Sequence, residues 1–334
     1  MIYRYGDNYA NIGSASGSSA GKYLVQYSTA RSLPPGLHLC NMAVKIHGNF
    51  CKKGFQGVIS PPGVYGTLLA RFRIENNGTD VAKVHALQNR TSLTCQGGDR
   101  PGVQAPSLSP AMMNASLSSQ EPTRALQLTA RVAPFNPPRN ISDLPRVTRM
   151  LRAAGIHNGE YQPQVPNLTA LGASVKKIVA GISTLPENTM HLQNGWTQLA
   201  PQVQGDYGKN YAMRLYVAYS GYLCLRASEA LYPMYTPSGN QEVKLTLGPE
   251  EAYIVTFSSK PPLATKGFWS LTAYNSQKFL INNPLGRYSV GDRTELTYPD
   301  GIPVYGNQSS HDDGSFQVLI QPADTQPPAN WTSK

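Results

Sequence analysis

Strict alternation of apolar and polar residues marks the C-terminal part of the chain. Residues 242–248, 252–258, 268–274 and 316–321 each place an apolar side chain at every second position. Successive side chains of a β-strand point to opposite faces, so a period of two predicts strands with one buried face, as in an antiparallel sheet. We therefore predict a C-terminal antiparallel β-domain from about Gln241 to Gln321.

The N-terminal part has the pattern of another β-domain. Its apolar runs are short and are separated by Gly, Ser and Pro, which is typical of strands joined by turns. A short helix over residues 81–89 is expected next, with Thr79 as its candidate N-cap. Residues 94–138 lack periodicity and predict a long surface connection. The four apolar runs are residues 22–28, 37–46, 54–60 and 64–74.

Three segments between these regions have helical periodicity. They are residues 143–155, 168–182 and 206–230, with Ser142 and Asn167 as candidate N-caps of the first two. We interpret the first two as amphipathic packing helices.

The third helical segment carries a tyrosine-rich stripe. Large aromatic side chains at helical spacing favour packing in a core or an interface over the wall of a ligand site, because they bury much area and each hydroxyl needs only one partner. The stripe consists of Tyr207, Tyr211, Leu215, Tyr219 and Tyr222.

Composition favours two turn-rich globular domains. The chain has 334 residues, 40% of them hydrophobic and 14% charged, with 30 Gly and 27 Pro. The net charge of +10 comes from scattered Lys and Arg residues, whereas a nucleic-acid surface needs a basic stripe, so we expect no nucleic-acid partner. No apolar run is long enough to span a bilayer.

Potential glycosylation sites indicate a secreted parent protein, although residues 1–17 lack the apolar core of a secretory signal. N-x-Ser/Thr triplets occur more often than chance predicts, with chance in a Ser/Thr-rich chain as the alternative. The candidate sites are Asn77, Asn89, Asn114, Asn140, Asn167, Asn307 and Asn330.

The cysteines support the same compartment. Cys40 and Cys51 are close enough in sequence to close a short disulfide loop. With His38 and His47 they could instead form a metal site, but tight zinc-ligand pairs are missing, and we favour the disulfide.

Motifs for catalysis are weak. Ser19 lies in a G-x-S-x-G pattern, but a polar loop leads into a strand there, and a nucleophile elbow needs a strand followed by a helix. No P-loop or dinucleotide-binding motif occurs, so no cofactor is expected. Residues 311–313, His-Asp-Asp, have the composition of an exposed turn.

Two families are similar to parts of this sequence. "YGDNYANIGSASGSSAGKYLV" and "GVYGTLLARFRIENNGTDVAKVHALQNRTSL" resemble the later part of the domain of unknown function 1254. "GDYGKNYAMRLYVAYSGY", "EALYP", "GFWSLTAYN", "NNPLGRYSVGDRTELTYPDG" and "PANW" resemble its usual companion, the domain of unknown function 1214. The resemblance implies a mainly β fold with helical connections, in two antiparallel β-sandwich or jelly-roll-like domains. It supplies no activity and no catalytic residues.

The resemblance also suggests a domain organisation. We expect a partial N-terminal β-domain over residues 1–95, an irregular connection over 96–140, and a helical segment with the C-terminal β-domain over 141–334. Relatives carry further sequence before this match, so the first domain is expected to be truncated at its N-terminus. A missing strand would leave an unpaired sheet edge that promotes self-association, for example into a homo-oligomer.

A charged block near the C-terminus has two interpretations. Arg287, Asp292 and Arg293 match the family's "RYSxGDR" block. Gly286 and Gly291 favour a structural corner in which Asp292 accepts hydrogen bonds or pairs with an Arg. The alternative is a site for an anionic ligand, because an Arg fork suits a carboxylate or phosphate.

Two function classes follow. The first is a secreted protein that binds a small apolar or sugar-like ligand in an aromatic-lined cleft. The second is a cofactor-free enzyme that acts on a small organic molecule in secondary metabolism. The candidate ligand-binding residues are Arg287, Asp292, Arg293, Trp269, Trp196, Tyr207, Tyr211 and His191.

Overall fold

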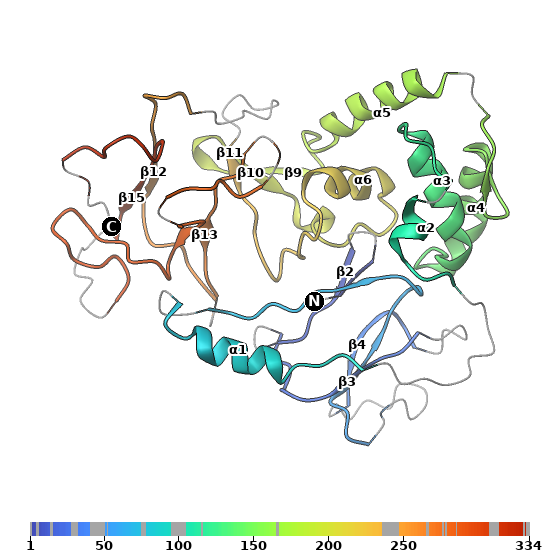
Figure 1. Cartoon of the computed structure of the whole chain (residues 1–334), viewed down its shortest axis with the longest axis horizontal. Helices are drawn as coiled ribbons and strands as arrows, with labels where there is room; N and C mark the ends of the chain where they lie inside the picture. The colour runs from blue at the N-terminus through green and yellow to red at the C-terminus, as the bar shows by residue number, and fades with distance from the viewer. Residues whose placement is uncertain are drawn as a thin grey trace. The chain divides into compact units, whose positions relative to one another are not determined.

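The chain folds into two compact units, each built from two separate stretches of sequence. These are Met1–Ala70 with Gly97–Val243, and Arg71–Gln96 with Lys244–Lys334. Figure 1 labels their helices and strands. The computed structural model describes residues 2–4 (backbone only), 7–13, 16–27, 33–40, 51, 53–74, 78–94, 105–114, 116–164, 167–235, 247–264, 267–275, 277, 279–284, 286–306, 314–329 and 331.

Two three-stranded sheets form the N-terminal β part of the first unit. Their strand orders are β2-β1-β6 and β3-β5-β4, with β5 parallel to β3 and antiparallel to β4. Every residue of β2 and β5 is buried. Tyr9, Ala10 and Ile59 form the core of this part. The strands are β1 (Ile2–Arg4), β2 (Asp7–Ala10), β3 (Tyr23–Val25), β4 (Gly36–Leu39), β5 (Gly57–Ser60) and β6 (Thr67–Leu68).

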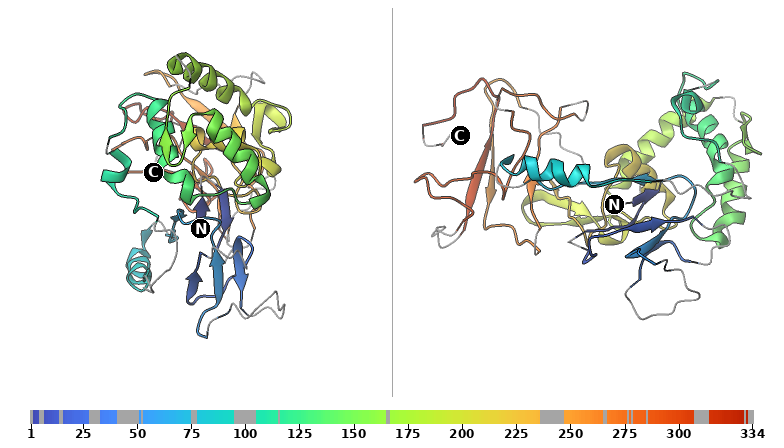
Figure 2. Two further views of the ribbon diagram at one scale, coloured as in Figure 1. Left: turned by 90° about the vertical axis from the view of Figure 1, so that its right-hand side faces the viewer. Right: turned by 60° about the horizontal axis from the view of Figure 1, so that its bottom comes forward.

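Helices and smaller strands form the rest of the first unit. Helix α5 lies next to α6 (Figures 1 and 2), and Val179, Ile182, Met213 and Val217 meet in the core between them. The helices are α2 (Pro110–Asn114), α3 (Thr123–Val132), α4 (Leu144–Ala153), α5 (Leu168–Ile182) and α6 (Tyr211–Ser220), with 3-10 turns η2 (Ala133–Phe135), η3 (Ile141–Asp143), η4 (Gln193–Gly195) and η5 (Pro201–Val203). The strands are β7 (Ile156–His157), β8 (Glu160–Tyr161), β9 (Thr189–His191), β10 (Trp196–Leu199) and β11 (Met234–Tyr235).

The second unit contains helix α1 (Val81–Asn89) and two antiparallel strand pairs. Strand β12 (Tyr253–Phe257) pairs with β15 (Phe316–Ile320), and β13 (Ser270–Leu271) pairs with β14 (Val290–Gly291). The predicted antiparallel pairing is thus confirmed for the described C-terminal strands. Residues 241–246, which include most of another predicted strand, lie outside the described residues.

Aromatic packing holds the second unit together. The Phe257 and Phe316 rings stack with centroids 4.5 Å apart, and Trp269 lies 4.9 Å from Phe257. Phe257 and Phe316 are cross-strand partners at the end of the β12–β15 ladder, so the alternation seen in the sequence directs both rings to the same face.

The helix predicted over residues 168–182 is confirmed as α5, which has the same bounds. Asn167 caps it, since its Oδ1 accepts a hydrogen bond from the Ala170 amide at 2.9 Å. The prediction that Ser142 caps α4 was wrong. Instead, Asn140 accepts a hydrogen bond from the Ser142 amide at 3.1 Å and begins η3, which leads into α4.

The helix predicted over residues 206–230 is much shorter. Asn210 caps α6 by accepting from the Met213 amide at 2.9 Å, and the helix ends at Ser220 before Gly221. Helix α6 buries Met213, Tyr216 and Val217, a different face from the tyrosine-rich stripe. Core packing was therefore the wrong interpretation for Tyr219 and Tyr222, which are exposed.

Helices α2 and α3 were missed in the region expected to be irregular. Pro and Ser residues flank both helices and obscure their boundaries in the sequence. Helix α3 buries Ala130 and no other of its residues, and its remaining apolar side chains are half-buried or exposed. The boundary expected near residue 95 lies outside the described residues.

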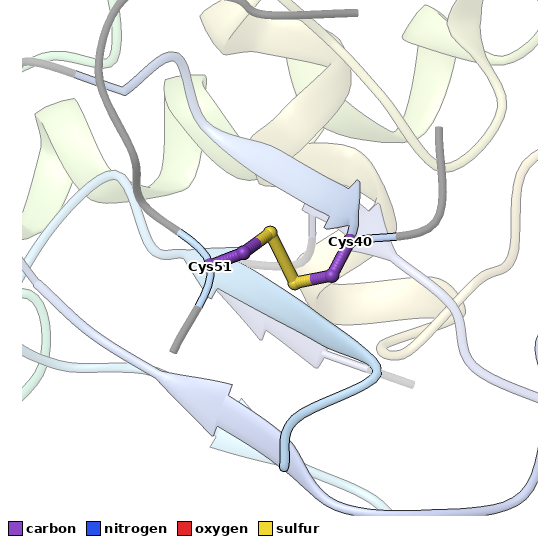
Figure 3. The surroundings of a disulfide bond; sticks show 2 residues. All are labelled: Cys40 and Cys51. Carbon is purple, nitrogen blue, oxygen red and sulfur yellow. A yellow bond between two sulfur atoms is a disulfide. The ribbon is translucent and has the colours of Figure 1, made fainter. Parts of the chain in front are cut away.

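The Cys40–Cys51 disulfide is confirmed. Figure 3 shows it leaving the end of β4 at Cys40. The two Cα atoms are 5.5 Å apart, and the Cys40 amide donates to the Gln56 carbonyl at 3.0 Å. The bond therefore reinforces the place where β4 begins to pair with β5, and a metal site that uses Cys40 and Cys51 is not formed.

At the level of fold class, the structure is a mixed α and β protein with several small sheets. The described strands form sheets of two or three strands each, and the two-sandwich organisation stays a prediction. None of the described helices is both long and apolar enough to cross a membrane.

Candidate functional site

A polar, partly open pocket in the first unit is a candidate for a ligand site. Its volume is about 340 Å³, which lies within the range of small-molecule sites. Part of its wall comes from β2 and β4, and part from the segments around residues 139 and 226. The lining residues are Tyr9, Ala10, Asn11, Ser16, Pro35, Gly36, Leu37, Arg139, Arg226, Ser228 and Glu229.

Two arginines in this wall share one carboxylate. The Nη1 of Arg139 donates to Asp206 Oδ1 at 3.1 Å and to Oδ2 at 2.9 Å. The Nη2 of Arg226 donates to the same Oδ2 at 2.8 Å. Asp206 therefore fixes both guanidinium groups beside the pocket, and each uses a single nitrogen to bind it.

A buried ion pair fixes strand β2 to the same region. Asp7 Oδ2 accepts from Arg214 Nη2 at 2.7 Å, and Asp7 Oδ1 accepts from the Tyr207 amide at 3.1 Å. Asp7 is 7% exposed. Burial raises the pKa of Asp7 above its ordinary value, while Arg214 and the Tyr207 amide oppose the rise and Asp206 adds to it. The desolvation of Asp7 outweighs the attraction of its partners.

Gly205 allows these segments to approach closely. Its φ is +74°, and a Cβ atom there would lie 2.4 Å from the Arg226 amide nitrogen and from the Leu225 carbonyl carbon. The Gly205 carbonyl accepts from the Asn8 amide at 2.6 Å. A side chain at position 205 would therefore separate Arg226 from the turn that carries Asp206.

Tyr207 lies in the core below this turn rather than in the pocket wall. It is 3% exposed, and its hydroxyl accepts from the Gly205 amide at 3.3 Å. Burial raises the pKa of Tyr207, and it raises the pKa of the neighbouring Cys224 thiol to about 11. Both groups therefore stay protonated at neutral pH and are poorly suited to act as a base or a nucleophile.

The Tyr211 ring contacts two guanidinium groups. The guanidinium carbon of Arg146 lies 5.0 Å from the ring centroid, and that of Arg214 lies 5.1 Å away. These are cation–π distances. The ring links α4 to α6. This position favours a structural role for Tyr211 over a role in contacting a ligand.

His191 and Trp196 lie on the small β9–β10–β11 sheet, outside the pocket lining. His191 is exposed and faces Thr197 in the ladder. Trp196 contacts Tyr235 edge to face, with centroids 5.5 Å apart. The structure brings neither residue together with the charged groups around Asp206.

Asp292 in the second unit forms a structural corner. It accepts a hydrogen bond from the Trp269 amide at 2.9 Å, and its Oδ2 lies 3.7 Å from Arg293 Nε. The Trp269 indole donates to the Tyr305 hydroxyl at 2.7 Å. Trp269 is therefore held by core partners on both its backbone and its side chain.

Arg287 lies apart from this corner. Its side chain is exposed, and its backbone amide and carbonyl both bond to Asn283. Within the described residues, Asp292 pairs with Arg293 and not with Arg287. The expectation that Asp292 accepts a hydrogen bond or pairs with an Arg is confirmed with the Trp269 amide and Arg293, while the Asn283 turn holds the Arg287 backbone away from this pairing.

Four of the predicted glycosylation sites are described, and all four are exposed: Asn89, Asn114, Asn140 and Asn167. The side-chain hydrogen bonds of Asn114, Asn140 and Asn167 use the oxygen atom. A glycan attaches to the nitrogen, so these bonds leave the attachment atom free. Asn77, Asn307, Asn330 and the 311–313 turn lie outside the described residues.

Comparison with known proteins bears on the C-terminal part of the chain. Residues 229–333 match the family model described as "Protein of unknown function (DUF1214)", and the predicted resemblance to that domain is confirmed there. No curated protein and no solved structure matches the chain. Most of the pocket, including Arg139 and Arg226, lies outside the matched residues.

Sequence reasoning missed the residues that shape the pocket. Asp7, Arg139, Asp206, Arg214 and Arg226 are single charges in unrelated local contexts. Asp7 and Arg214 are separated by 207 positions, so no spacing rule could pair them. A weak signal was present in the scarcity of acidic residues, since a buried Asp in a basic chain usually has a cationic partner.

We predict that the stability of the native protein relative to Asp7→Asn falls as the pH rises. Folding raises the pKa of Asp7 above the ordinary 3.8, so the folded chain holds the proton more tightly than the unfolded chain does. The contribution of Asp7 to the free energy of unfolding is therefore complete at pH values below its unfolded-state pKa. This contribution is lost as the pH rises through its folded-state pKa. Denaturant unfolding of both proteins from acid to neutral pH measures this difference. A relative stability that increases with pH would show that Arg214 outweighs burial.

We also predict that Asp292→Ala lowers the free energy of unfolding by roughly 2–3 kcal/mol, because the Trp269 amide loses a charged acceptor. The matched variant Arg287→Ala should change it by less than about 0.5 kcal/mol, since the side chain is exposed. Thermal and denaturant unfolding of both variants tests the contrast. Equal effects would contradict the corner interpretation.

Proposed function

We propose that this chain is a secreted binding protein whose ligand is a small, polar, sugar-like molecule held in the pocket beside Asp206. The observation that carries the proposal is a pocket of about 340 Å³ whose wall contains two guanidinium groups fixed by one carboxylate. Ligand sites usually place a few polar groups in fixed positions to orient the ligand.

The sequence left two ligand classes open, a small apolar molecule and a sugar-like molecule. The pocket lining favours the sugar-like one. Asn11, Ser228, Glu229 and the two arginines supply polar side chains, and Tyr9 is the aromatic residue among those that line the pocket. Tyr9 is itself buried, so it offers little surface for an apolar ligand. A hydroxyl-rich molecule matches such a wall, because each hydroxyl both donates and accepts.

The alternative is a cofactor-free enzyme that uses Arg287, Asp292, Tyr207 or His191. These residues are divided between the two units, and Tyr207 keeps its proton at neutral pH because burial raises its pKa. No observation on the described residues favours this alternative over binding.

Secretion of the parent protein is supported by the disulfide and by the exposed glycosylation sites. In the same proposal, residues 5–93 correspond to the later part of the domain of unknown function 1254, and the two β regions correspond to sandwich-like domains.

Mass spectrometry of protein from its native host tests the compartment. We expect glycan mass on at least one of Asn89, Asn114, Asn140 and Asn167, and an intact Cys40–Cys51 bond before reduction. Unmodified sequons together with two free thiols would contradict secretion.

Ligand-observed NMR with neutral monosaccharides tests binding in the pocket. We expect saturation transfer to at least one sugar, and a loss of affinity of roughly tenfold or more in Ser228→Trp, because the indole fills the space that the ligand needs. Ser174→Trp on the exposed side of α5 is the matched control and should bind as the native protein does. No transfer to any sugar, or equal transfer with Ser228→Trp, would overturn the proposal.

A further inference from the structure

The arginine pair beside the pocket has more hydrogen-bonding capacity than Asp206 uses. A guanidinium group has five N–H donors on three nitrogens. Within the described residues, Arg139 bonds through Nη1 alone and Arg226 through Nη2 alone. The Nε of Arg226 is buried without a hydrogen-bond partner there. Nη2 and Nε of Arg139 and Nη1 of Arg226 therefore remain available to another acceptor.

The charge balance also leaves room for an anion. Two guanidinium groups share one carboxylate, so the Arg139–Asp206–Arg226 group carries a net positive charge. Its arginine side chains are 37% and 36% exposed, and Asp206 is 30% exposed. At this partial burial a charged hydrogen bond is stronger than one made in open water.

Glu229 is the opposing charge in the pocket lining. It is exposed, and the described residues provide no hydrogen bond or ion pair to its carboxylate. Nothing in this part of the chain holds Glu229 over the pocket, whereas Asp206 holds both arginines in place. Solvent screens a free surface charge more than it screens a fixed, partly buried pair.

From this geometry we infer that the pocket recognises a carboxylate on its ligand, and that the ligand class is a sugar acid. A carboxylate presents two oxygens that match the arginine fork. The shared Asp206 orients both guanidinium groups before the ligand arrives, which reduces the entropy lost on binding. This inference rests on the proposed function, because it assigns the chemical class of ligand for the same pocket.

Calorimetric titration with three probes separates the two claims. Glucuronate carries both the ring and the carboxylate, glucose carries the ring alone, and acetate carries the carboxylate alone. We expect glucuronate to bind roughly tenfold or more tightly than either of the others. Its affinity should also fall as the salt concentration rises.

Two variants with opposite charge changes keep the test independent of folding. Arg139→Gln should weaken glucuronate binding roughly tenfold and weaken glucose binding much less, because glucose has no carboxylate to lose a charged partner, while Glu229→Gln should strengthen glucuronate binding. A general loss of structure would weaken both probes in both variants, so a gain in Glu229→Gln cannot arise from unfolding.

Each outcome decides one of the claims. Equal binding of glucuronate and glucose, unaffected by Arg139→Gln, overturns the carboxylate inference and leaves the sugar-binding proposal in place. Equal binding of glucuronate and acetate, lost in Arg139→Gln, supports carboxylate recognition and overturns the sugar-like ligand. Absence of binding by all three probes overturns both.

Discussion

The attachment of strand β2 to the turn at residues 205–207 determines the geometry of the candidate site. Asp7 accepts from the Tyr207 amide and pairs with Arg214, while the next residue, Asn8, donates its amide to Gly205. The strand that contributes Tyr9 and Ala10 to the pocket is thereby joined to the turn that contributes Asp206. If this attachment were lost, the two sides of the pocket would have no fixed spacing.

The attachment of β2 has an unfavourable part and a favourable part. Burying the ionised Asp7 carboxylate lowers the stability of the fold, whereas its bonds to Arg214 and the Tyr207 amide raise it. Burial raises the pKa of Asp7 despite its partners, which shows that the ionised carboxylate is less well stabilised in the fold than in water. Such buried charges are often better explained by the geometry they impose than by net stabilisation. Here the imposed geometry includes the approach of Gly205 to Leu225 and Arg226, which only a glycine permits.

Several parts of the fold could be predicted because their signals are local. Helix α5 has both a periodic apolar face and Asn167 at its start, and the β12–β15 ladder has strict alternation on both strands. Cys40 and Cys51 are close in sequence, so their pairing needed no knowledge of the fold. The tyrosine stripe misled because the helix begins at Tyr211, and burial of Met213 and Val217 sets a different inward face.

The candidate site could not be predicted, because its residues are joined only by tertiary contacts. Arg139, Asp206 and Arg226 come from a loop and two turns, where no periodicity applies, and the charged block at residues 287–293 offered a stronger local pattern that proved to be a corner. A crystal structure grown with glucuronate is the decisive measurement. We expect the carboxylate to lie within hydrogen-bonding distance of Arg139 and Arg226, with Asp206 still bridging them. Glucuronate bound elsewhere, or bound in this pocket through its ring alone, would contradict it.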